Sequence, residues 1–524
     1  MLKGRRAVAR SAFEAGLGLF RSALEAQPGL FQRYPALITD LGRCFQFADS
    51  GNEGVDLFLE WERAAPSAAL RYQLLYFAGR IARARGDYNR SRELFTQALA
   101  FAPDDLQEDA CVWYAMDTAL RDFAADSTAD SATDPAGLVA VWASRWNDPP
   151  YFDDILDRIA ASLALSGQWR RFPEVLALLQ GTASRASIAI YAYISGRAIA
   201  LGLASPEGGG AAALPEAARE EAAQQEAARQ EAAQPYFRLA YGAGDLYYRA
   251  LGAYFLGEPF PGPESDRRIS PGRSRQEMEF LLGFFDAGIP GLALPWIETM
   301  MGELSAGELR VLAKALGAAG LYADQIRLVS AYMGRDDYEI VRQDLELLSP
   351  RPFQELVEEE ARRAGLAPEL LYGLIRTESA FQAEIVSWAG AVGLTQLMPA
   401  TAADMAGRIR AQGGPNYTGD MAANLRDPAI NVRIGAYYLA YLRDLIDHPL
   451  IRILAYNGGM NRVRRWYREA SEHISPALPG DLFLETVELA ETRNYGRKVV
   501  TAALLYGFLY YDVKADPFLA DICR

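Results

Sequence analysis

The sequence predicts an almost entirely α-helical protein with more than one domain. Its 524 residues are too many for one compact core and suggest roughly two to four domains. Half of the residues are hydrophobic, as in globular proteins. Apolar residues recur about every 3.6 positions through nearly the whole chain, whereas strand signals are sparse.

A repeat is visible in the N-terminal part when each Phe is aligned with a Pro eight residues later. The pairs are Phe20 with Pro28, Phe58 with Pro66, and Phe95 with Pro103, at intervals of 38 and 37 residues. Such intervals are typical of helical hairpins, which stack into a solenoid because each hairpin buries its face only against its neighbours. The third copy has spacings close to the tetratricopeptide pattern, and its small residues predict close helix packing. Repeats alone favour a protein-binding array over a scaffold that positions a polymer.

Two low-complexity stretches interrupt this pattern. Residues 126–135 are rich in Asp, Ser, Thr and Ala, as in a surface loop. Residues 216–235 form four Ala-rich pentads, and a five-residue period turns each residue type by about 140° around a helix, so that no apolar stripe forms. We expect a semi-rigid exposed helix or a partly disordered insert that the chemistry does not need. Helical periodicity resumes over 236–348, with Trp296, Met300 and Met301 in a core.

An acidic residue stands on the apolar face of the next predicted helix. Leu371, Leu374, Ile375 and Glu378 occupy positions i, i+3, i+4 and i+7, and Pro368 suits the first turn. Burial there would raise the pKa of Glu378, so that the carboxyl could hold a proton near neutral pH, as a general acid requires. The alternative is a structural acid that reaches the rim of the helix or pairs with Arg376.

Two further segments could line a ligand site. Residues 390–401 contain two glycines and a proline around one isolated amide, Gln396, and glycines let the backbone pass close to a ligand. An ordinary loop between helices has the same spacing. The apolar run 451–455 ends in Tyr456, Asn457 and two glycines, which a helix C-cap alone would explain.

The order of these motifs resembles the soluble lytic transglycosylase family, whose catalytic domain is similar to goose-type lysozyme. The motifs are Glu378-Ser379, Gly393 to Pro399, Ala455-Tyr456-Asn457, and Glu491 to Tyr495. The resemblance implies a TPR-like solenoid followed by a lysozyme-like α catalytic domain. The domains we expect are TPR-like repeats in 1–202, an Ala/Glu/Gln-rich insert in 203–235, helical repeats and a linker in 236–350, and the catalytic domain in 351–516.

The reaction that the resemblance implies is cleavage of the β-1,4 bond between N-acetylmuramic acid and N-acetylglucosamine in peptidoglycan glycan strands. No water is consumed, because the muramyl 6-hydroxyl attacks its own anomeric carbon and leaves a 1,6-anhydro end. Glu378 matches the single acid/base, and no cofactor or metal is implied. Most glycosidases instead use two carboxyls, and the nearest second acid, Glu384, is expected in a solvated loop.

The resemblance also carries over substrate-binding positions. Gln396 and Met398 match residues that line the glycan groove, Ser387 and Thr401 match polar contacts to the sugars, and Glu491 matches a second wall of the cleft. Tyr456 and Asn457 match the pair that braces the muramyl ring, and Tyr495 matches a phenol near the catalytic carboxyl. The tyrosines and Met398 could equally be core residues. Two departures, Thr395 for Met and Gly458 for Ala, would reshape the groove wall and loosen the turn after Asn457.

Charge and composition exclude several other classes. The net charge of −14 argues against a nucleic-acid surface, and the arginines after Asn457 are expected to form a solvated helix face rather than a contact for peptide carboxylates. Three widely spaced cysteines, Cys44, Cys111 and Cys523, indicate no disulfide framework and no metal motif. His448 and His473 alone are poor material for a zinc site or a catalytic triad.

Location and competing functions rest on less direct observations. No apolar run reaches the length of a transmembrane helix, and the N-terminus has no clear signal peptide. A periplasmic or cell-envelope location, with cell-wall proteins as possible partners of the solenoid, is inferred from the implied substrate alone. The competing readings are a hydrolytic muramidase that uses water in the same cleft, and a non-catalytic scaffold that binds glycan or partner proteins.

Overall fold

The computed structural model describes residues 2–125, 134–204, 216–262, 275–335, 338–474 and 478–524. These residues form helices joined by turns, and the extended pairing found among them is limited to two isolated β-bridges, Val386 with Val392 and Val392 with Leu397. The predicted all-α fold class is therefore confirmed. None of the helices in these ranges is long and apolar enough to cross a membrane.

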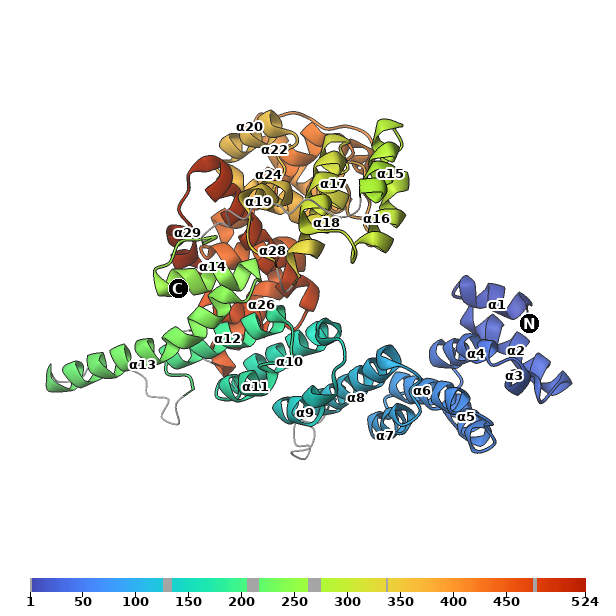
Figure 1. Ribbon diagram of the computed structural model, residues 1–524. Coiled ribbons are helices and arrows are strands. Elements are labelled where there is room, and N and C mark those ends of the chain that lie inside the picture. Colours follow the sequence, from blue (N-terminus) through green and yellow to red (C-terminus); the bar gives the residue numbers. More distant parts are fainter. Residues whose placement is uncertain (1, 126–133, 205–215, 263–274, 336–337, 475–477) are drawn as a thin grey trace. The chain divides into compact units, whose positions relative to one another are not determined.

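The chain divides into two compact units (Figure 1). The first comprises Met1–Leu163 and Arg170–Tyr191, and the second comprises Ala164–Trp169 and Ala192–Arg524. Helices of the first unit are α1 (Leu2–Ala9), α2 (Phe13–Ala26), α3 (Leu30–Arg33), α4 (Ala36–Phe47), α5 (Glu53–Arg63), α6 (Ala68–Ala84), α7 (Tyr88–Leu99), α8 (Asp105–Ala125), α9 (Pro135–Trp142), α10 (Asp153–Leu165) and α11 (Arg171–Leu179). Helix α12 (Arg185–Ala200) begins in the first unit and ends in the second.

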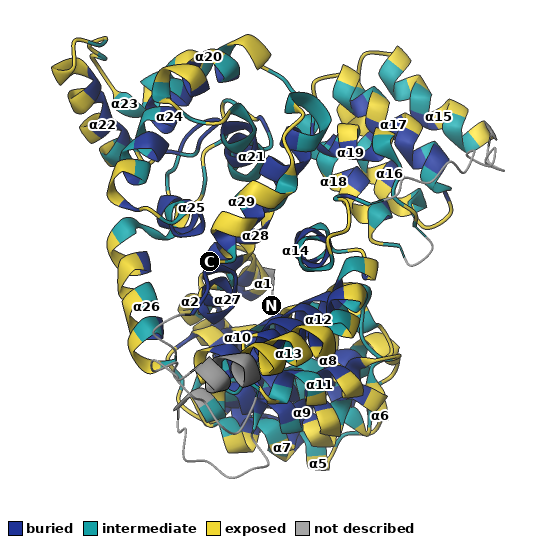
Figure 2. Cartoon of the chain, turned by 90° about the vertical axis from the view of Figure 1, so that its left-hand side faces the viewer, coloured by how far each residue is buried: buried dark blue, intermediate teal, exposed yellow. Residues whose placement is uncertain are grey.

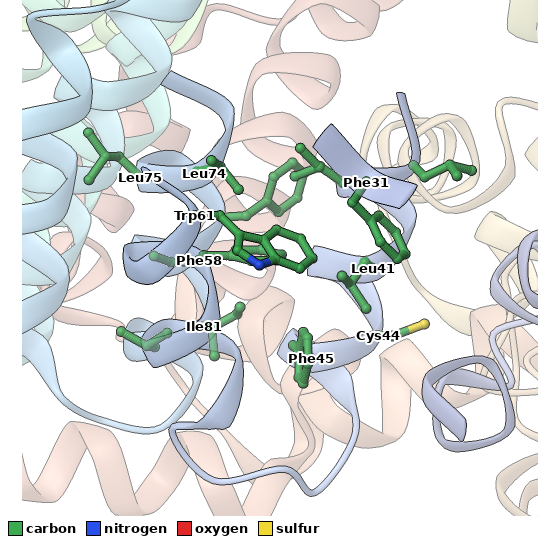
Figure 3. Packing of buried hydrophobic residues seen from close by; sticks show 14 of the residues in the cluster. Phe31, Leu41, Cys44, Phe45, Phe58, Trp61, Leu74, Leu75 and Ile81 are labelled. Atoms are coloured by element: carbon green, nitrogen blue, oxygen red, sulfur yellow. The ribbon is translucent and has the colours of Figure 1, made fainter. Parts of the chain in front are cut away.

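The three repeat phenylalanines anchor the core of the first unit. Phe20 of α2, Phe58 of α5 and Phe95 of α7 are each fully buried, and each helix ends a few residues before the paired proline. Phe58 packs edge-on against Phe45 and tilts against Trp61, as Figure 3 shows. Phe20 and Phe58 belong to one apolar cluster, whereas Phe95 packs against Tyr76 and Tyr114. The repeat therefore marks three helices that each bury one aromatic ring.

Close packing within the third repeat depends on a small residue, as predicted. A Cβ added to Gly79 of α6 would lie 3.0 Å from the Phe95 ring of α7. The hydroxyl of Ser91 donates to the Gly79 carbonyl oxygen at 2.9 Å and satisfies a polar group in this buried seam. Gly79 thus lets the two helices of the hairpin approach to the distance that the ring requires.

The second unit contains the insert and the remaining helices. They are α13 (Glu216–Gly242), α14 (Leu246–Leu256), α15 (Arg275–Asp286), α16 (Leu294–Met300), α17 (Ala306–Ala318), α18 (Tyr322–Met333), α19 (Arg342–Leu348), α20 (Gln354–Ala364), α21 (Pro368–Ser379), α22 (Pro399–Ala411), α23 (Met421–Asn424), α24 (Pro428–Leu445), α25 (Pro449–Gly458), α26 (Met460–His473), α27 (Gly480–Thr486), α28 (Ala490–Tyr506) and α29 (Ala515–Ile522).

The alanine-rich pentads belong to the long helix α13. Residues 223–228 of this helix are exposed (Figure 2), and burial of its side chains begins only at Ala233 and Phe237. An exposed helix is one of the two forms predicted for this stretch. The Gly-rich segment 207–210 and most of the loop 126–135 lie outside the described residues. The residue ranges of the four expected domains remain predictions.

Helices α15 to α19 pack around their own apolar cluster, which includes Leu281, Leu309 and Tyr332. Met300 and Met301 pack against this cluster, as expected. The prediction was wrong for Trp296, whose residue is 50% exposed and whose ring lies edge-on to Phe280. Helix α16 is only seven residues long, so helical periodicity could not assign a buried face to it.

Candidate active site

Glu378 lies one residue before the C-terminal end of α21. Leu371, Leu374 and Ile375 are fully buried on this helix, and Glu378 is half-buried one turn further along. Pro368 occupies the first turn, as predicted, and Ala380 ends the helix in the left-handed conformation with φ 45°. The helix therefore carries the carboxyl from the fully buried core to a half-buried position near its end.

The surroundings of Glu378 favour its protonated form. The pKa of Glu378 is raised to about 8, chiefly by burial; the nearby hydroxyl of Tyr495 lowers it, and the charge of Glu491 raises it. Arg376 does not neutralise the carboxyl, because its Nε donates to the Leu348 carbonyl oxygen at 2.7 Å and burial lowers its own pKa. At neutral pH, Glu378 is mostly a carboxylic acid that can donate a proton.

Two buried tyrosines from different helices face this carboxyl. Tyr456 of α25 donates its hydroxyl to the Thr395 carbonyl oxygen at 3.0 Å, and the charge of Glu378 raises its pKa. Tyr495 of α28 interacts with Glu378, yet its hydroxyl makes no hydrogen bond of normal geometry to any described residue. A buried, unsatisfied hydroxyl beside an acid is available to a ligand. Sequence reasoning missed Tyr438 of α24, whose ring lies 5.0 Å from that of Tyr456.

A compact loop, residues 385–397, connects α21 to α22. Val392 forms β-bridges to Val386 and Leu397, so the loop folds into a short double turn. The amide nitrogen of Gln396 donates to the carbonyl oxygens of Gly393 at 2.8 Å and Ile385 at 3.3 Å. Gln396 itself has φ 45°, a conformation that costs energy in a residue other than glycine. The predicted groove residue is therefore also a brace of the loop.

The loop is held from below by Asn431 of α24, which sequence reasoning did not identify. Its amide oxygen accepts from the backbone N and the hydroxyl of Thr395, at 2.8 and 2.7 Å. Its amide nitrogen donates to the carbonyl oxygens of Val392 and Leu425, both at 2.9 Å. These four bonds use the full capacity of the side chain.

Thr395 consequently does not reshape the groove wall, contrary to our expectation. Its side chain is fully buried and points at Asn431 and Gly435 beneath the loop. A Cβ on Gly435 would lie 2.4 Å from the Thr395 hydroxyl, so this space is already filled. At the other departure, a Cβ on Gly458 would lie 3.2 Å from Thr492, which leaves little room for Ala.

The remaining predicted residues lie at the ends of the elements around Glu378. Ser387 closes the turn at the tip of the loop, where its hydroxyl accepts from the Ala391 backbone N at 3.0 Å. Met398 is 43% exposed at the start of α22, and Thr401 is half-buried in its first turn. Exposure of Met398 argues against the alternative that it is a core residue.

Asn457 and Glu491 are both exposed, and each lies close in sequence to one of the two tyrosines. The hydroxyl of Thr492 donates to the Asn457 amide oxygen at 2.8 Å, which joins the end of α25 to the start of α28. Glu491 lies close enough to Glu378 to raise its pKa. Glu384 is exposed in a turn beyond α21, as predicted.

Trp388 is a candidate that sequence reasoning did not find. It follows Ser387 at the loop tip, and 97% of it is exposed. A large aromatic ring on the surface of a well-braced loop has no role in the core. Its only signal in the sequence was a tryptophan placed among turn residues, which periodicity does not assess.

The arginines after Asn457 form a solvated face, as predicted. Arg462, Arg464, Arg465 and Arg468 are exposed on α26 (Figure 2), and Arg465 and Arg468 pair with glutamates one turn later at 3.8 and 3.9 Å. In the described ranges, the three cysteines are free and no His, Cys, Asp or Glu cluster could hold a metal ion.

Fold and site together define a class. The protein is α-helical, and a compact domain in its C-terminal part presents one half-buried, protonated carboxyl between two buried tyrosines and a braced loop. Such an arrangement is suited to proton transfer to a bound ligand.

Comparisons with known proteins support this class. The family model of the transglycosylase SLT domain matches residues 355–475. Membrane-bound lytic murein transglycosylase C of Actinobacillus pleuropneumoniae serotype 5b is 34% identical over 172 residues, which cover 30% of this chain and 46% of that protein. Soluble lytic murein transglycosylase of Salmonella typhimurium is 29% identical over 163 residues, 31% of this chain and 24% of that protein. The chain thus spans less than half the length of these relatives.

The fold is similar over a longer stretch than the sequence. The structure of an inactive mutant of the lytic transglycosylase Slt from Pseudomonas aeruginosa aligns with a TM-score of 0.55 at 20% identity, covering 97% of this chain and 80% of that one. A complex of a 70-kDa soluble lytic transglycosylase with bulgecin A aligns with a TM-score of 0.52 at 16% identity, covering 92% and 69%. These likenesses concern the fold alone. The chain is therefore identified as an α-helical protein with a transglycosylase SLT domain, and the predicted resemblance is confirmed.

Proposed function

We propose that the protein is a peptidoglycan lytic transglycosylase with Glu378 as its single acid/base. The observation that carries this proposal is the carboxyl of Glu378, which is half-buried, has a pKa of about 8 and is not paired with Arg376, whose Nε donates to the Leu348 carbonyl oxygen instead. The other carboxyl that influences it, Glu491, is exposed. One protonated acid without a buried partner suits a reaction in which the substrate supplies its own nucleophile.

In the first step, Glu378 donates its proton to the glycosidic oxygen between N-acetylmuramic acid and N-acetylglucosamine. The bond from that oxygen to the muramyl anomeric carbon breaks, and positive charge develops on the muramyl ring. The oxygen dipoles of Tyr456 and Asn457 are suited to stabilise this charge, because both are held in place by hydrogen bonds.

In the second step, the carboxylate of Glu378 accepts the proton of the muramyl 6-hydroxyl. The 6-oxygen then bonds to the anomeric carbon and closes the 1,6-anhydro ring, so Glu378 returns to its protonated form and no water is used. The Tyr495 hydroxyl, which lowers the pKa of Glu378, stabilises the carboxylate between the two steps.

Substrate-binding roles are proposed for the residues around the cleft. Gln396, Met398, Ser387, Thr401 and Glu491 would contact the glycan strand. The hydrogen bonds that brace the loop are made by the amide nitrogen of Gln396, and Met398 is 43% exposed beside it. Trp388 at the loop tip would stack against the apolar face of a sugar ring.

Substrate and location follow from the same proposal. Peptidoglycan glycan strands would be the substrate, residues 351–516 would carry the chemistry, and the enzyme would act in the periplasm or cell envelope. The helical repeats would orient the polymer or bind cell-wall proteins.

The test is mass spectrometry of the products after purified protein is incubated with peptidoglycan. We expect disaccharide-peptides that are one water lighter than their hydrolysed counterparts. These products should disappear with Glu378→Gln and persist with the matched control Glu384→Gln, because Glu384 is exposed outside the helix. Reducing-end products would identify a muramidase instead. Glycan binding without any product would favour the non-catalytic scaffold.

A further inference from the structure

A cleft of about 510 Å³ lies within the SLT domain and does not include Glu378. It is formed by helices α20, α22 and α24 together with the turn that follows α22. Its volume falls in the range of small-ligand sites. None of the residues proposed to take part in the reaction, such as Glu378, Tyr456 and Tyr495, lines this cleft.

Helix α24 separates this cleft from the catalytic site. Arg433, Tyr437, Ala440 and Asp444 line the cleft and are spaced i, i+4, i+7 and i+11, which places them on one face of the helix. Asn431 supports the Thr395 loop, and Tyr438 packs against Tyr456. Both residues are rotated around the same helix by roughly 140° from the face that lines the cleft. The two sites therefore use opposite faces of one helix.

The lining is unusually rich in guanidinium groups for an acidic protein. Four arginines and two carboxylates face the cleft, in a chain whose net charge is −14. They are Arg363, Arg408, Arg433, Arg443, Glu360 and Asp444. The local excess of positive charge favours an anionic group inside the cleft.

Two of the four arginines already have structural partners. Arg443 pairs with Asp444 at 3.1 Å and donates to the Gly365 carbonyl oxygen at 2.6 Å, which ties α24 to the end of α20. Arg363 pairs with Glu360 at 3.2 Å. These groups shape the wall of the cleft and are poorly placed to bind a ligand.

The other two arginines are better placed to meet a ligand. Arg433 lies 4.0 Å from Glu360, beyond hydrogen-bonding distance, and is close to the Tyr417 hydroxyl. The Arg408 guanidinium stacks 4.6 Å above the Tyr441 ring, and its partner Asp404 is exposed to solvent, where such pairs are weak. Tyr437, between Arg433 and Tyr441 on α24, completes a row of one cation and two rings.

We propose that this cleft is a binding site for a short peptide with a free carboxylate, which Arg433 and Arg408 would bind through charge-assisted hydrogen bonds. The two tyrosine rings provide a flat apolar surface for the peptide backbone or a small side chain. Glu360, only 6% exposed, and Asp444 offer acceptors for peptide N–H or ammonium groups. The same two carboxylates repel ligands of high negative charge, so the lining favours a peptide carboxylate over a phosphate.

The site takes no part in the reaction at Glu378, so it can be tested separately. Calorimetric titration of full-length Glu378→Gln protein with the peptide acetyl-Ala-Glu-Ala, which has two carboxylates, should detect binding. The uncharged acetyl-Ala-Gln-Ala amide and inorganic phosphate serve as comparison ligands. Binding in a catalytically inactive variant cannot be attributed to turnover, and its absence leaves the transglycosylase proposal untouched.

Substitutions locate the binding within the cleft. Arg433→Gln or Arg408→Gln should lower the affinity for the peptide by about tenfold to a hundredfold, the loss expected for one charge-assisted hydrogen bond. Arg410→Gln is the matched control, because Arg410 is an exposed arginine of α22 outside the cleft. Thermal unfolding of each variant should match the parent protein, which separates lost binding from lost folding.

Three results would overturn the proposal. One is equal binding of the acid and its amide. Another is peptide binding that neither Arg433→Gln nor Arg408→Gln weakens. The third is the absence of any peptide binding at millimolar concentration. Phosphate binding as tight as that of the peptide would also overturn it.

Discussion

Glu378 lies half-buried on the core-facing side of a helix, and this position sets its protonation. Burial keeps the proton on the carboxyl up to a pH of about 8, since Arg376, the nearest cation in sequence, is directed to Leu348 instead. Tyr495 limits the rise because its hydroxyl interacts with the carboxylate. The acid is thus poised to give and to take back a proton near neutral pH.

The pH dependence of activity follows from this pKa. The free enzyme must carry the proton on Glu378, so kcat/KM for peptidoglycan should be constant at neutral pH and fall about tenfold per pH unit above a pH of about 8. The measurement is initial-rate turbidity loss of a peptidoglycan suspension between pH 6 and 10. Activity that already falls about tenfold per pH unit from pH 6 would show that the pKa of Glu378 is not raised, and activity that rises with pH would show that its carboxylate is the active form.

Stability should depend on pH through the same group. The folded pKa of about 8 lies above the ordinary value of 4.5, so the folded state keeps a proton that the unfolded chain loses. Stability from this group is therefore full below about pH 4.5 and is lost as pH rises toward 8, by at most about 1.4 kcal/mol per pH unit. Glu378→Gln cannot ionise, so its melting temperature should exceed that of the wild type by a margin that grows from pH 5 to pH 8.

The comparison with Glu384→Gln controls this measurement, because that residue is exposed in a turn. A margin for Glu378→Gln that stays constant across the pH range would mean that Glu378 is ionised in the folded protein.

Trp388 is expected to contribute to binding rather than to folding. It is 97% exposed, so Trp388→Ala removes no buried surface and should leave the melting temperature unchanged. Loss of a ring that stacks on a sugar should raise KM by about fivefold to tenfold at nearly constant kcat. Steady-state kinetics on soluble glycan strands would test this, and an unchanged KM would remove Trp388 from the site.

Individual residues were predictable where they broke a pattern. Glu378 was found because an acid stood at an apolar helix position, and Glu384 because it lay beyond the end of that helix. Asn431 could not be found, because its hydrogen bonds depend on tertiary structure. Two of its partner residues, Val392 and Thr395, are 39 and 36 residues away along the sequence. Thr395 was misjudged for the same reason, since only the fold directs its side chain inward.

At the scale of elements, the site depends on the packing of α21 against α28. A Cβ added to Gly373 of α21 would lie 2.9 Å from the Ala503 nitrogen and 3.0 Å from the Val499 carbonyl oxygen. The two helices therefore touch through their backbones. Since α21 carries Glu378 and α28 carries Tyr495, this contact sets the distance between the two side chains.

Gly373→Ala should separate these helices. The added methyl group meets backbone atoms that cannot rotate away, so we expect a loss of about 1–3 kcal/mol in unfolding free energy, with a matching loss of kcat. Gly407→Ala on α22 is the control, because a Cβ there meets nothing within 4 Å and should be neutral or slightly stabilising. Chemical denaturation of both variants would measure their unfolding free energies. A Gly373→Ala variant as stable as the parent would show that the interface between the two helices can relax.

Helix periodicity predicted that α21 exists and which face it buries, but it could not predict this contact. A glycine inside a helix has a low helix propensity, so the sequence suggests that Gly373 destabilises α21, whereas in the structure it permits the close approach of α28. The short helix α16 shows the opposite error, because seven residues gave too little pattern to place Trp296.

At the scale of the whole chain, the repeats were predictable because they recur. Three phenylalanines at nearly equal intervals each became a fully buried core residue, and Gly79 packs against the third. How the two units are used together cannot be deduced from these local patterns. The link between the repeats and glycan therefore remains part of the functional proposal.

The insert should be dispensable. Residues 223–228 of α13 are exposed, and its buried side chains begin at Ala233, so deletion of residues 207–226 removes no described core residue. We expect unchanged products and a melting temperature within a few degrees of the parent. Loss of activity with unchanged stability would assign the insert a role in substrate or partner binding, contrary to our expectation.

The backbone contact at Gly373 also bears on how the Glu378 proton exchanges with solvent. Where two helices touch through their main chains, no file of water can run between them. This contact therefore offers the Glu378 proton no path to bulk water along the α21–α28 seam. A glycan strand that covered the carboxyl would limit its exchange further, so the proton given to the leaving oxygen and the proton taken from the 6-hydroxyl would pass between enzyme and sugar.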